Sequence, residues 1–86
     1  MYTVLVSGTF QKQFSSLDPS LQKRIRVELQ ALIGDPFTPR AGVDIKPLVA
    51  TSPRKYRLRI GNYRIVYAIE GDTVKLVEGF VRERGY

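Results

Sequence analysis

The chain has 86 residues, enough for one domain with a single small core, and its formal net charge of +6 comes from 14 lysines and arginines against 8 acidic residues. It contains no cysteine and no histidine, which excludes disulfides, thiol nucleophiles, thiolate metal sites and the usual general base at neutral pH. The basic balance favours an anionic partner, and the excess of arginine over lysine suits bidentate contact with phosphate.

Composition and hydropathy predict a single soluble domain over residues 1–86, located in the cytoplasm. Residues 1–8 are too short and too polar for a secretory signal, and no apolar run reaches the length that crosses a membrane. We therefore expect no membrane partner. Because the few carboxylates are scattered along the chain, we also expect no metal and no other cofactor.

The beginning of the chain predicts a strand followed by a short helix. Residues 2–6 are rich in β-branched and aromatic side chains, as in an opening strand. Phe10, Phe14 and Leu17 then recur at helical spacing with polar residues between them. A short amphipathic helix is therefore expected here.

A second, longer helix is predicted immediately afterwards. Asp18 is suited to cap its first turn and Pro19 to occupy its first position, and an apolar stripe continues until Gly34 ends it. Residues 35–53 contain four of the five prolines and show no period, so they are predicted to form a long connection. Three apolar residues are expected to hold this connection against the core: Val43, Ile45 and Leu48.

The centre of the chain is predicted to be a β-hairpin. Two alternating runs flank Gly61-Asn62, and glycine fits the first central position of a two-residue turn, which requires positive φ. Such a turn places Ile60 opposite Tyr63 and Arg59 opposite Arg64. The apolar face of the hairpin would then consist of Tyr56, Leu58, Ile60, Tyr63, Ile65 and Tyr67. The other face would carry the cations Lys55, Arg57, Arg59 and Arg64.

The four cations form the strongest functional signal in the sequence. No acidic residue lies within the hairpin, and like charges opposed across strands are unfavourable. We interpret the cluster as a site that the fold itself does not neutralise and that binds an anion, most commonly nucleic acid. The alternative is that these are solvated side chains on a half-exposed sheet.

A third antiparallel strand is predicted over residues 74–80, after a Gly-Asp turn. Strict pairing places Leu76 and Phe80 on the apolar face together with Glu78, and a bulge near Gly79 would re-aim the residues that follow. The complete pattern predicts an α+β fold, with an N-terminal strand, a helical hairpin and a three-stranded antiparallel meander. Both helices should pack on one face of a small sheet, opposite the cations.

These residues suit RNA cleavage better than other hydrolytic chemistry. RNA carries its own nucleophile, the 2′-hydroxyl beside each phosphodiester, so the protein needs no covalent nucleophile. Arginines can stabilise the negative charge that develops on the phosphate, but arginine does not release its proton. Lys55 and Tyr86 are the candidates for moving protons.

The pattern from Tyr56 to Tyr67, followed by a Gly-Asp turn, a strand and a tail with Arg82 and Tyr86, resembles the RelE toxins of the RelE/ParE superfamily. The resemblance covers essentially the whole chain. It implies the RelE fold, which is similar to that of microbial ribonucleases, and the role of toxin in a type II toxin–antitoxin system. It also implies a metal-independent, ribosome-dependent endoribonuclease that cleaves mRNA in the ribosomal A site. The partners would be the ribosome, mRNA and an acidic, RelB-like antitoxin.

The resemblance further implies roles for single residues. Arg57, Arg59 and Arg64 would contact the scissile phosphate, and Arg82 would assist charge or proton transfer. Tyr86 would orient or deprotonate the 2′-hydroxyl and stack on the base. Further RNA contacts are expected from Arg54, Lys55 and Arg84.

Two alternative functions remain open at the level of the sequence. ParE toxins share the fold but inhibit DNA gyrase by protein contact and have no nuclease site. The chain would also fit a non-catalytic relative that binds RNA or an antitoxin.

Overall fold

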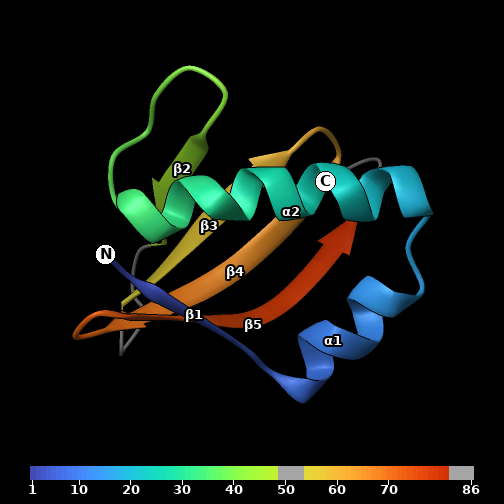
Figure 1. Ribbon diagram of the computed structural model, residues 1–86, viewed down its shortest axis with the longest axis horizontal. Coiled ribbons are helices and arrows are strands. Elements are labelled where there is room, and N and C mark those ends of the chain that lie inside the picture. Colours follow the sequence, from blue (N-terminus) through green and yellow to red (C-terminus); the bar gives the residue numbers. More distant parts are fainter. Residues whose placement is uncertain (49–53, 82–86) are drawn as a thin grey trace.

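The computed structural model describes residues 1–48 and 54–81, which form a five-stranded mixed sheet with two helices on one face (Figure 1). The elements are β1 (Thr3–Val6), α1 (Gly8–Ser15), α2 (Pro19–Gly34), β2 (Asp44–Pro47), β3 (Lys55–Ile60), β4 (Tyr63–Glu70) and β5 (Thr73–Val81). The strand order is β1-β5-β4-β3-β2. The predicted α+β class, helical hairpin and antiparallel meander are thereby confirmed.

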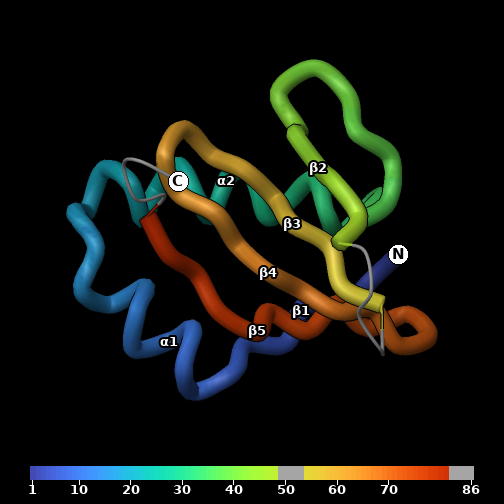
Figure 2. The backbone as a smooth tube through the Cα atoms, turned by 180° about the vertical axis from the view of Figure 1, so that it is seen from behind, coloured from blue at the N-terminus to red at the C-terminus, as the bar shows by residue number. Residues whose placement is uncertain are grey.

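The N-terminal strand completes one edge of the sheet. β1 pairs with β5 in parallel, with Thr3 beside Thr73 and Val6 beside Leu76. The two helices connect β1 to the far side of the sheet and cover one face. Seen from behind, the other face carries no helix of the described chain (Figure 2). We call this second surface the open face.

The other edge strand, β2, was not predicted. Its four residues pair antiparallel with β3 inside the region that the sequence indicated to be an irregular connection. That prediction is wrong for this stretch, because β2 owes its structure to pairing with β3 rather than to a local pattern. Its final residue is a proline, which an edge strand tolerates. Val43 and Ile45 are buried and Leu48 is partly buried, so the expected anchoring of this segment is confirmed.

The helices begin as their sequences suggest, with one exception. Ser7 caps α1 by accepting a hydrogen bond from the Phe10 N–H at 3.0 Å. Pro19 is the first residue of α2, as predicted, but the Asp18 side chain makes no capping hydrogen bond within the described chain. The Asp18 carboxylate instead accepts a hydrogen bond from the Ser20 hydroxyl. Neither described helix is long and apolar enough to span a membrane.

The core lies between the helices and the apolar face of the meander. The register of the hairpin is the predicted one, with Ile60 opposite Tyr63 and Arg59 opposite Arg64, and Gly61 has the expected positive φ of 58°. The most deeply buried residues on the sheet side are Leu58, Ile60, Tyr63, Ile65, Tyr67, Val74 and Leu76, and those on the helices are Phe10, Ile25 and Leu32.

A bulge in β5 changes the direction of the last side chains. The register between β4 and β5 shifts after Val66, which pairs with Glu78, to Tyr67, which pairs with Leu76. Val77 is therefore the extra residue, two positions before the predicted bulge. Leu76 reaches the core as predicted, but Glu78 and Phe80 lie on the open face.

The placement of Phe80 is thus a correction to the sequence prediction, and it has a steric counterpart at Gly79. Phe80 pairs with Arg64 on the open face instead of joining the core. Gly79 takes the inward position opposite Ile65, where an added Cβ would collide with the Tyr63 hydroxyl. Only glycine fits this inward position without displacing the tyrosine ring.

Helix α1 and its cap hold the bulge in place. The Ser7 hydroxyl donates a hydrogen bond of 2.6 Å to the Val77 carbonyl, and the Ser7 N–H donates to the Leu76 carbonyl at 3.0 Å. On the other side of the bulge, the Gly79 N–H donates to Gln13 Oε1 at 2.7 Å. The bulged backbone therefore has partners on both sides of the extra residue.

Candidate nucleic-acid interface

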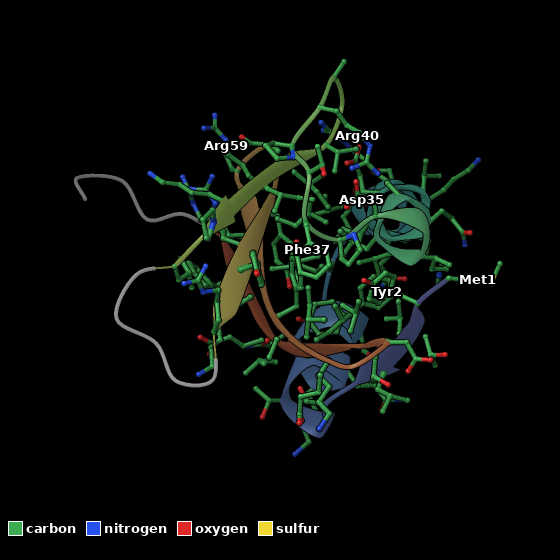
Figure 3. All side chains as sticks on the ribbon, turned by 90° about the vertical axis from the view of Figure 1, so that its left-hand side faces the viewer. Met1, Tyr2, Asp35, Phe37, Arg40 and Arg59 are labelled. Carbon is green, nitrogen blue, oxygen red and sulfur yellow. The ribbon has the colours of Figure 1, made fainter. Side chains whose placement is uncertain are left out.

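Basic side chains gather on the open face, as the sequence predicts. Arg59 lies opposite Arg64, while Arg57 is paired with Val66 and Lys55 with Ala68. Because paired residues of antiparallel strands share a face, all four predicted cations lie on the side of the sheet away from the helices. Viewed along the sheet, Arg59 points away from α2, whereas Phe37 lies between the sheet and the helix (Figure 3). Lys46 of β2 adds a fifth cation, opposite Arg57.

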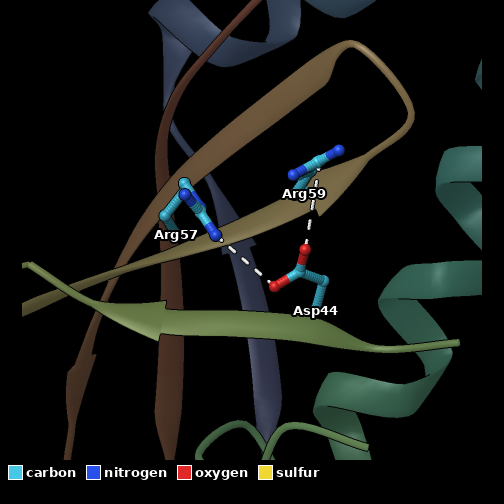
Figure 4. A network of polar contacts seen from close by, with 3 residues as sticks. All are labelled: Asp44, Arg57 and Arg59. Atoms are coloured by element: carbon cyan, nitrogen blue, oxygen red, sulfur yellow. Dashed lines mark hydrogen bonds and ion pairs between the residues drawn. The ribbon is translucent and has the colours of Figure 1, made fainter. Parts of the chain in front are cut away.

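An acidic residue lies among these cations, contrary to the expectation that the fold leaves them unneutralised. Asp44 Oδ1 is 3.4 Å from Arg57 Nη2, and Asp44 Oδ2 is 4.0 Å from Arg59 Nε (Figure 4). The physical reason is β2, which places Asp44 directly opposite Arg59. The carboxylate side chain is 53% exposed. Exposed ion pairs contribute at most about 1 kcal/mol, so an incoming phosphate can replace this carboxylate at low cost.

Arg57 is the most enclosed of the paired arginines. Its side chain is 18% exposed, against 48% for Arg59. Its Nε is buried and has no hydrogen-bond partner within the described chain. A buried charged donor without a partner is costly.

The bulge brings two unpredicted side chains to the same surface. One cross-strand row runs from Asp44 through Arg59 and Arg64 to Phe80, and Glu78 lies in the neighbouring row, on the far side of Val66 from Arg57. Sequence reasoning missed both placements because strict alternation puts Glu78 and Phe80 inside. The conflict of placing Glu78 in the core was the one available signal.

The remaining predicted site residues divide into two groups. Arg54 is exposed just before β3, and Lys55 is partly buried at the first position of that strand. The structure therefore brings Lys55 together with the three hairpin arginines. Arg82, Arg84 and Tyr86 lie outside the described residues, so their roles remain predictions.

The phenols with perturbed pKa values lie on the opposite side of the sheet from the arginines. Burial raises the pKa of Tyr63, and burial together with the neighbouring Tyr56 raises the pKa of Tyr67. The Tyr67 hydroxyl donates to the Pro36 carbonyl at 2.8 Å, which ties the connection after α2 to the sheet. Both phenols stay neutral in the folded protein and belong to the core rather than to the basic surface.

The connection after α2 is further ordered by Asp35. Its pKa is lowered because the Thr38 side chain and the backbone N–H groups of Phe37 and Thr38 donate hydrogen bonds to the carboxylate. Arg40 also fastens this segment, since its guanidinium donates to the carbonyls of Ala31 at 3.0 Å and Asp35 at 3.2 Å.

Arg59 and Arg64 are paired across β3 and β4, and we call them the arginine row. A polar pocket of about 350 Å³ adjoins this row at the end near β2. Its charged lining residues are Arg24, Glu28, Arg40, Asp44 and Arg59. Three arginines and two carboxylates nearly balance one another, and Arg40 already donates to the loop carbonyls. The pocket therefore forms the mixed-charge rim of the site, while the arginine row is its basic centre.

Comparison with known families gives matches over most of the chain. The family model of the ParE toxin of the type II toxin–antitoxin system, parDE, matches residues 4–82. The toxin RelE3 of Methanocaldococcus jannaschii is 31% identical over 71 residues, which are 83% of this chain and 80% of that protein. The residues that the family model matches include the hairpin with its arginines.

Solved structures show the same fold. The archaeal RelE–RelB complex from Pyrococcus horikoshii OT3 matches with a TM-score of 0.78 at 25% identity, covering 98% of both chains. The toxin–antitoxin complex RelBE2 from Mycobacterium tuberculosis matches with a TM-score of 0.73 at 26% identity, covering 94% of this chain and 98% of that one. The isolated E. coli RelE toxin has a TM-score of 0.79 at 17% identity, with coverage of 99% and 88%, and supports the fold alone.

Proposed function

Because the chain belongs to the RelE/ParE superfamily of type II toxin–antitoxin toxins, as a RelE-like member, we propose that it is an endoribonuclease that cleaves mRNA in the ribosomal A site and so inhibits translation. The observation that carries this proposal is the convergence of Arg57, Arg59 and Arg64 from two neighbouring strands on a sheet face that no described helix covers. The site of action would be the cytoplasm, where ribosomes are.

The proposed reaction uses the substrate's own nucleophile. The 2′-oxygen attacks the adjacent phosphorus and loses its proton, while the bond from phosphorus to the 5′-oxygen breaks and that oxygen gains a proton. Arginine side chains bind the non-bridging oxygens, where negative charge increases. Removing one such donor costs about 10²–10³ in rate. The charge that the reaction needs then comes from the protein, and the proposal requires no catalytic metal.

The roles of the arginines follow from their surroundings. Arg57, whose side chain is mostly enclosed and whose Nη2 already contacts a carboxylate oxygen of Asp44, is suited to hold a phosphate oxygen in a fixed position. Arg59 is more exposed and exchanges Asp44 for phosphate. Lys55 is a proton-transfer candidate at the edge of the group, and Arg82 and Tyr86 are proposed for proton transfer and base contact from the family resemblance.

We further propose an acidic RelB-like antitoxin as the cognate partner. Solved structures similar to this chain include RelE–RelB complexes from Pyrococcus horikoshii and Methanococcus jannaschii. The net charge of +6 gives an acidic protein a complementary surface. Such a partner would inhibit by covering the open face, so a complex in which the open face stays exposed would contradict this part of the proposal.

Primer extension on mRNA from translating ribosomes tests the nuclease proposal. Wild-type protein should produce cuts at the A-site codon, and Arg57→Ala should lower the cleavage rate about 10²–10³-fold. Lys23→Ala is the matched control, because Lys23 is an exposed cation on α2, which covers the other face of the sheet. Intact messages with the wild-type protein would refute the proposal.

A ParE-like activity is the second candidate, because the matching family model is that of the ParE toxin. A toxin of that branch would inhibit DNA gyrase by protein contact. Growth arrest accompanied by DNA damage, with messages left intact on the ribosome, would favour this candidate over the nuclease.

A further inference from the structure

We propose that Phe80 is a base-stacking platform, which holds an RNA base beside the phosphate that the arginines contact. This inference rests on the proposed nuclease function and adds to it a residue that binds the base rather than the backbone. Aromatic side chains bind unstacked bases of single-stranded RNA in this way because every base has a flat π-face.

The position of Phe80 relative to the arginines supports the proposal. Phe80 pairs with Arg64, and Arg64 pairs with Arg59, so the three side chains follow one another across three strands on the open face. Directly opposed residues in antiparallel strands have Cβ atoms about 4.5–5.5 Å apart. A nucleotide whose phosphate lies at the arginines can therefore place its base over the phenyl ring.

Phe80 is exposed because of the bulge in β5. If β5 paired with β4 without the bulge at Val77, alternation would turn Phe80 into the core; with the bulge, the side chain is 42% exposed. A half-exposed phenyl ring forfeits hydrophobic stabilisation. The hydrogen bonds from Ser7 to Val77 and from Gly79 to Gln13 nevertheless fix this arrangement.

A second exposed phenylalanine provides a comparison. Phe37 is 44% exposed, but its ring packs edge-on against Tyr2 and Tyr56, with centroids 6.0 and 5.7 Å apart. Phe80 makes no ring pair with any aromatic residue in the described chain. The two residues thus have similar exposure, but within the described residues Phe80 lies beside the arginines and its ring has no aromatic partner.

Fluorescence gives a direct test, because the protein contains no tryptophan. In Phe80→Trp the single indole would report on stacking, and Phe37→Trp is the control with matched exposure. The probes are a single-stranded RNA with 2′-O-methyl groups, which cannot be cleaved, and an abasic strand of the same length and charge. We expect the emission of Phe80→Trp to be quenched by the RNA with bases and not by the abasic strand, while Phe37→Trp responds to neither.

Cleavage rates separate stacking from mere packing. On programmed ribosomes, Phe80→Ala should lower the apparent second-order rate constant about tenfold or more, and Phe80→Tyr should keep it near that of the wild type. Phe80→Leu is the deciding variant, since leucine is apolar but not planar. It should behave like Phe80→Ala. Thermal unfolding of every variant shows whether the fold is retained.

The outcomes distinguish this inference from the function on which it rests. Wild-type cleavage that Phe80→Ala leaves unchanged, or that Phe80→Leu fully restores, overturns the stacking role and leaves the nuclease. Equal emission of Phe80→Trp with both strands also overturns it. Base-dependent quenching of Phe80→Trp without any cleavage by the wild-type protein would retain the stacking platform and refute the nuclease.

Discussion

Two tyrosines of β4 differ in a single hydrogen bond. Tyr63 and Tyr67 are both buried on the core side, and burial raises the pKa of both. The Tyr67 hydroxyl donates to the buried Pro36 carbonyl, whereas the Tyr63 hydroxyl has no partner in the described part of the chain. A buried polar group without a partner costs about 1–3 kcal/mol. The Tyr67 hydroxyl therefore stabilises the folded protein, whereas the Tyr63 hydroxyl destabilises it.

Removing each hydroxyl should change the free energy of unfolding in opposite directions. Tyr63→Phe removes an unpaired group and should raise it by about 1 kcal/mol, while Tyr67→Phe leaves the Pro36 carbonyl without its donor and should lower it by about 1–3 kcal/mol. Urea denaturation of the two variants beside the wild type measures both effects. Changes of the same sign would show that the Tyr63 hydroxyl has a partner in solution.

At this scale, the arginines of the site could be predicted from the sequence but their counter-ion could not. Arg57, Arg59 and Arg64 follow from alternation within one hairpin, which is local information. Asp44 precedes Arg57 by 13 residues and meets it only because β2 pairs with β3. No local pattern contains that pairing, so the ion pairs had to come from the structure.

Among the elements, the hairpin was predictable because its turn fixes its register. Gly61 has positive φ, and every pair that the two-residue turn implies is present between β3 and β4. β2 has only four residues, lies in a proline-rich stretch and acquires its conformation from its neighbour. The bulge was expected but misplaced, because its position depends on hydrogen bonds to Ser7 and Gln13, which lie about 70 residues earlier in the chain.

Strand β2 contributes a carboxylate that competes with the proposed ligand. Asp44→Asn should therefore raise the affinity for single-stranded RNA, because a phosphate would no longer displace an anion from Arg57 and Arg59. The cost in unfolding free energy should stay below about 1 kcal/mol. Fluorescence anisotropy of a labelled, non-cleavable RNA measures the affinity.

Asp72→Asn provides the control for that experiment. It removes the same charge from the exposed turn between β4 and β5, at the opposite end of the hairpin ladder from Asp44. Equal gains in both variants would mean that net charge alone, and not release of the two arginines, sets the affinity.

At the scale of the whole molecule, the two faces of one sheet carry different kinds of residue. The helices and the core occupy one side, and the open face carries Asp44, the basic residues and Phe80. The fold class could be predicted from the order of periodic segments, since one sheet face must be covered and the other was rich in cations. The edge position and parallel direction of β1 could not, because no turn connects it to its partner β5.

This separation predicts how binding to RNA depends on salt. Each phosphate contact in a single strand contributes about 0.7 to the slope of log affinity against log salt concentration. Arg59→Gln should reduce the slope by about that amount. Lys23→Gln, on the exposed side of α2, should leave the slope unchanged. Anisotropy titrations at several potassium chloride concentrations check this, and equal slopes for both variants would indicate binding without a preferred face.

The single extra residue in β5 shifts the inside-outside alternation of the strand by one position. From Glu78 onwards, each side chain has exchanged sides relative to an uninterrupted strand. Deleting Val77 would make the ladder regular, because Leu76 and Glu78 already pair with the adjacent residues Tyr67 and Val66, and Phe80 would stay on the open face. Only if the complete strand, with Val77 retained, paired without the bulge would Phe80 turn inward, so the local pairing of one strand, and not its composition, decides whether this ring faces the core.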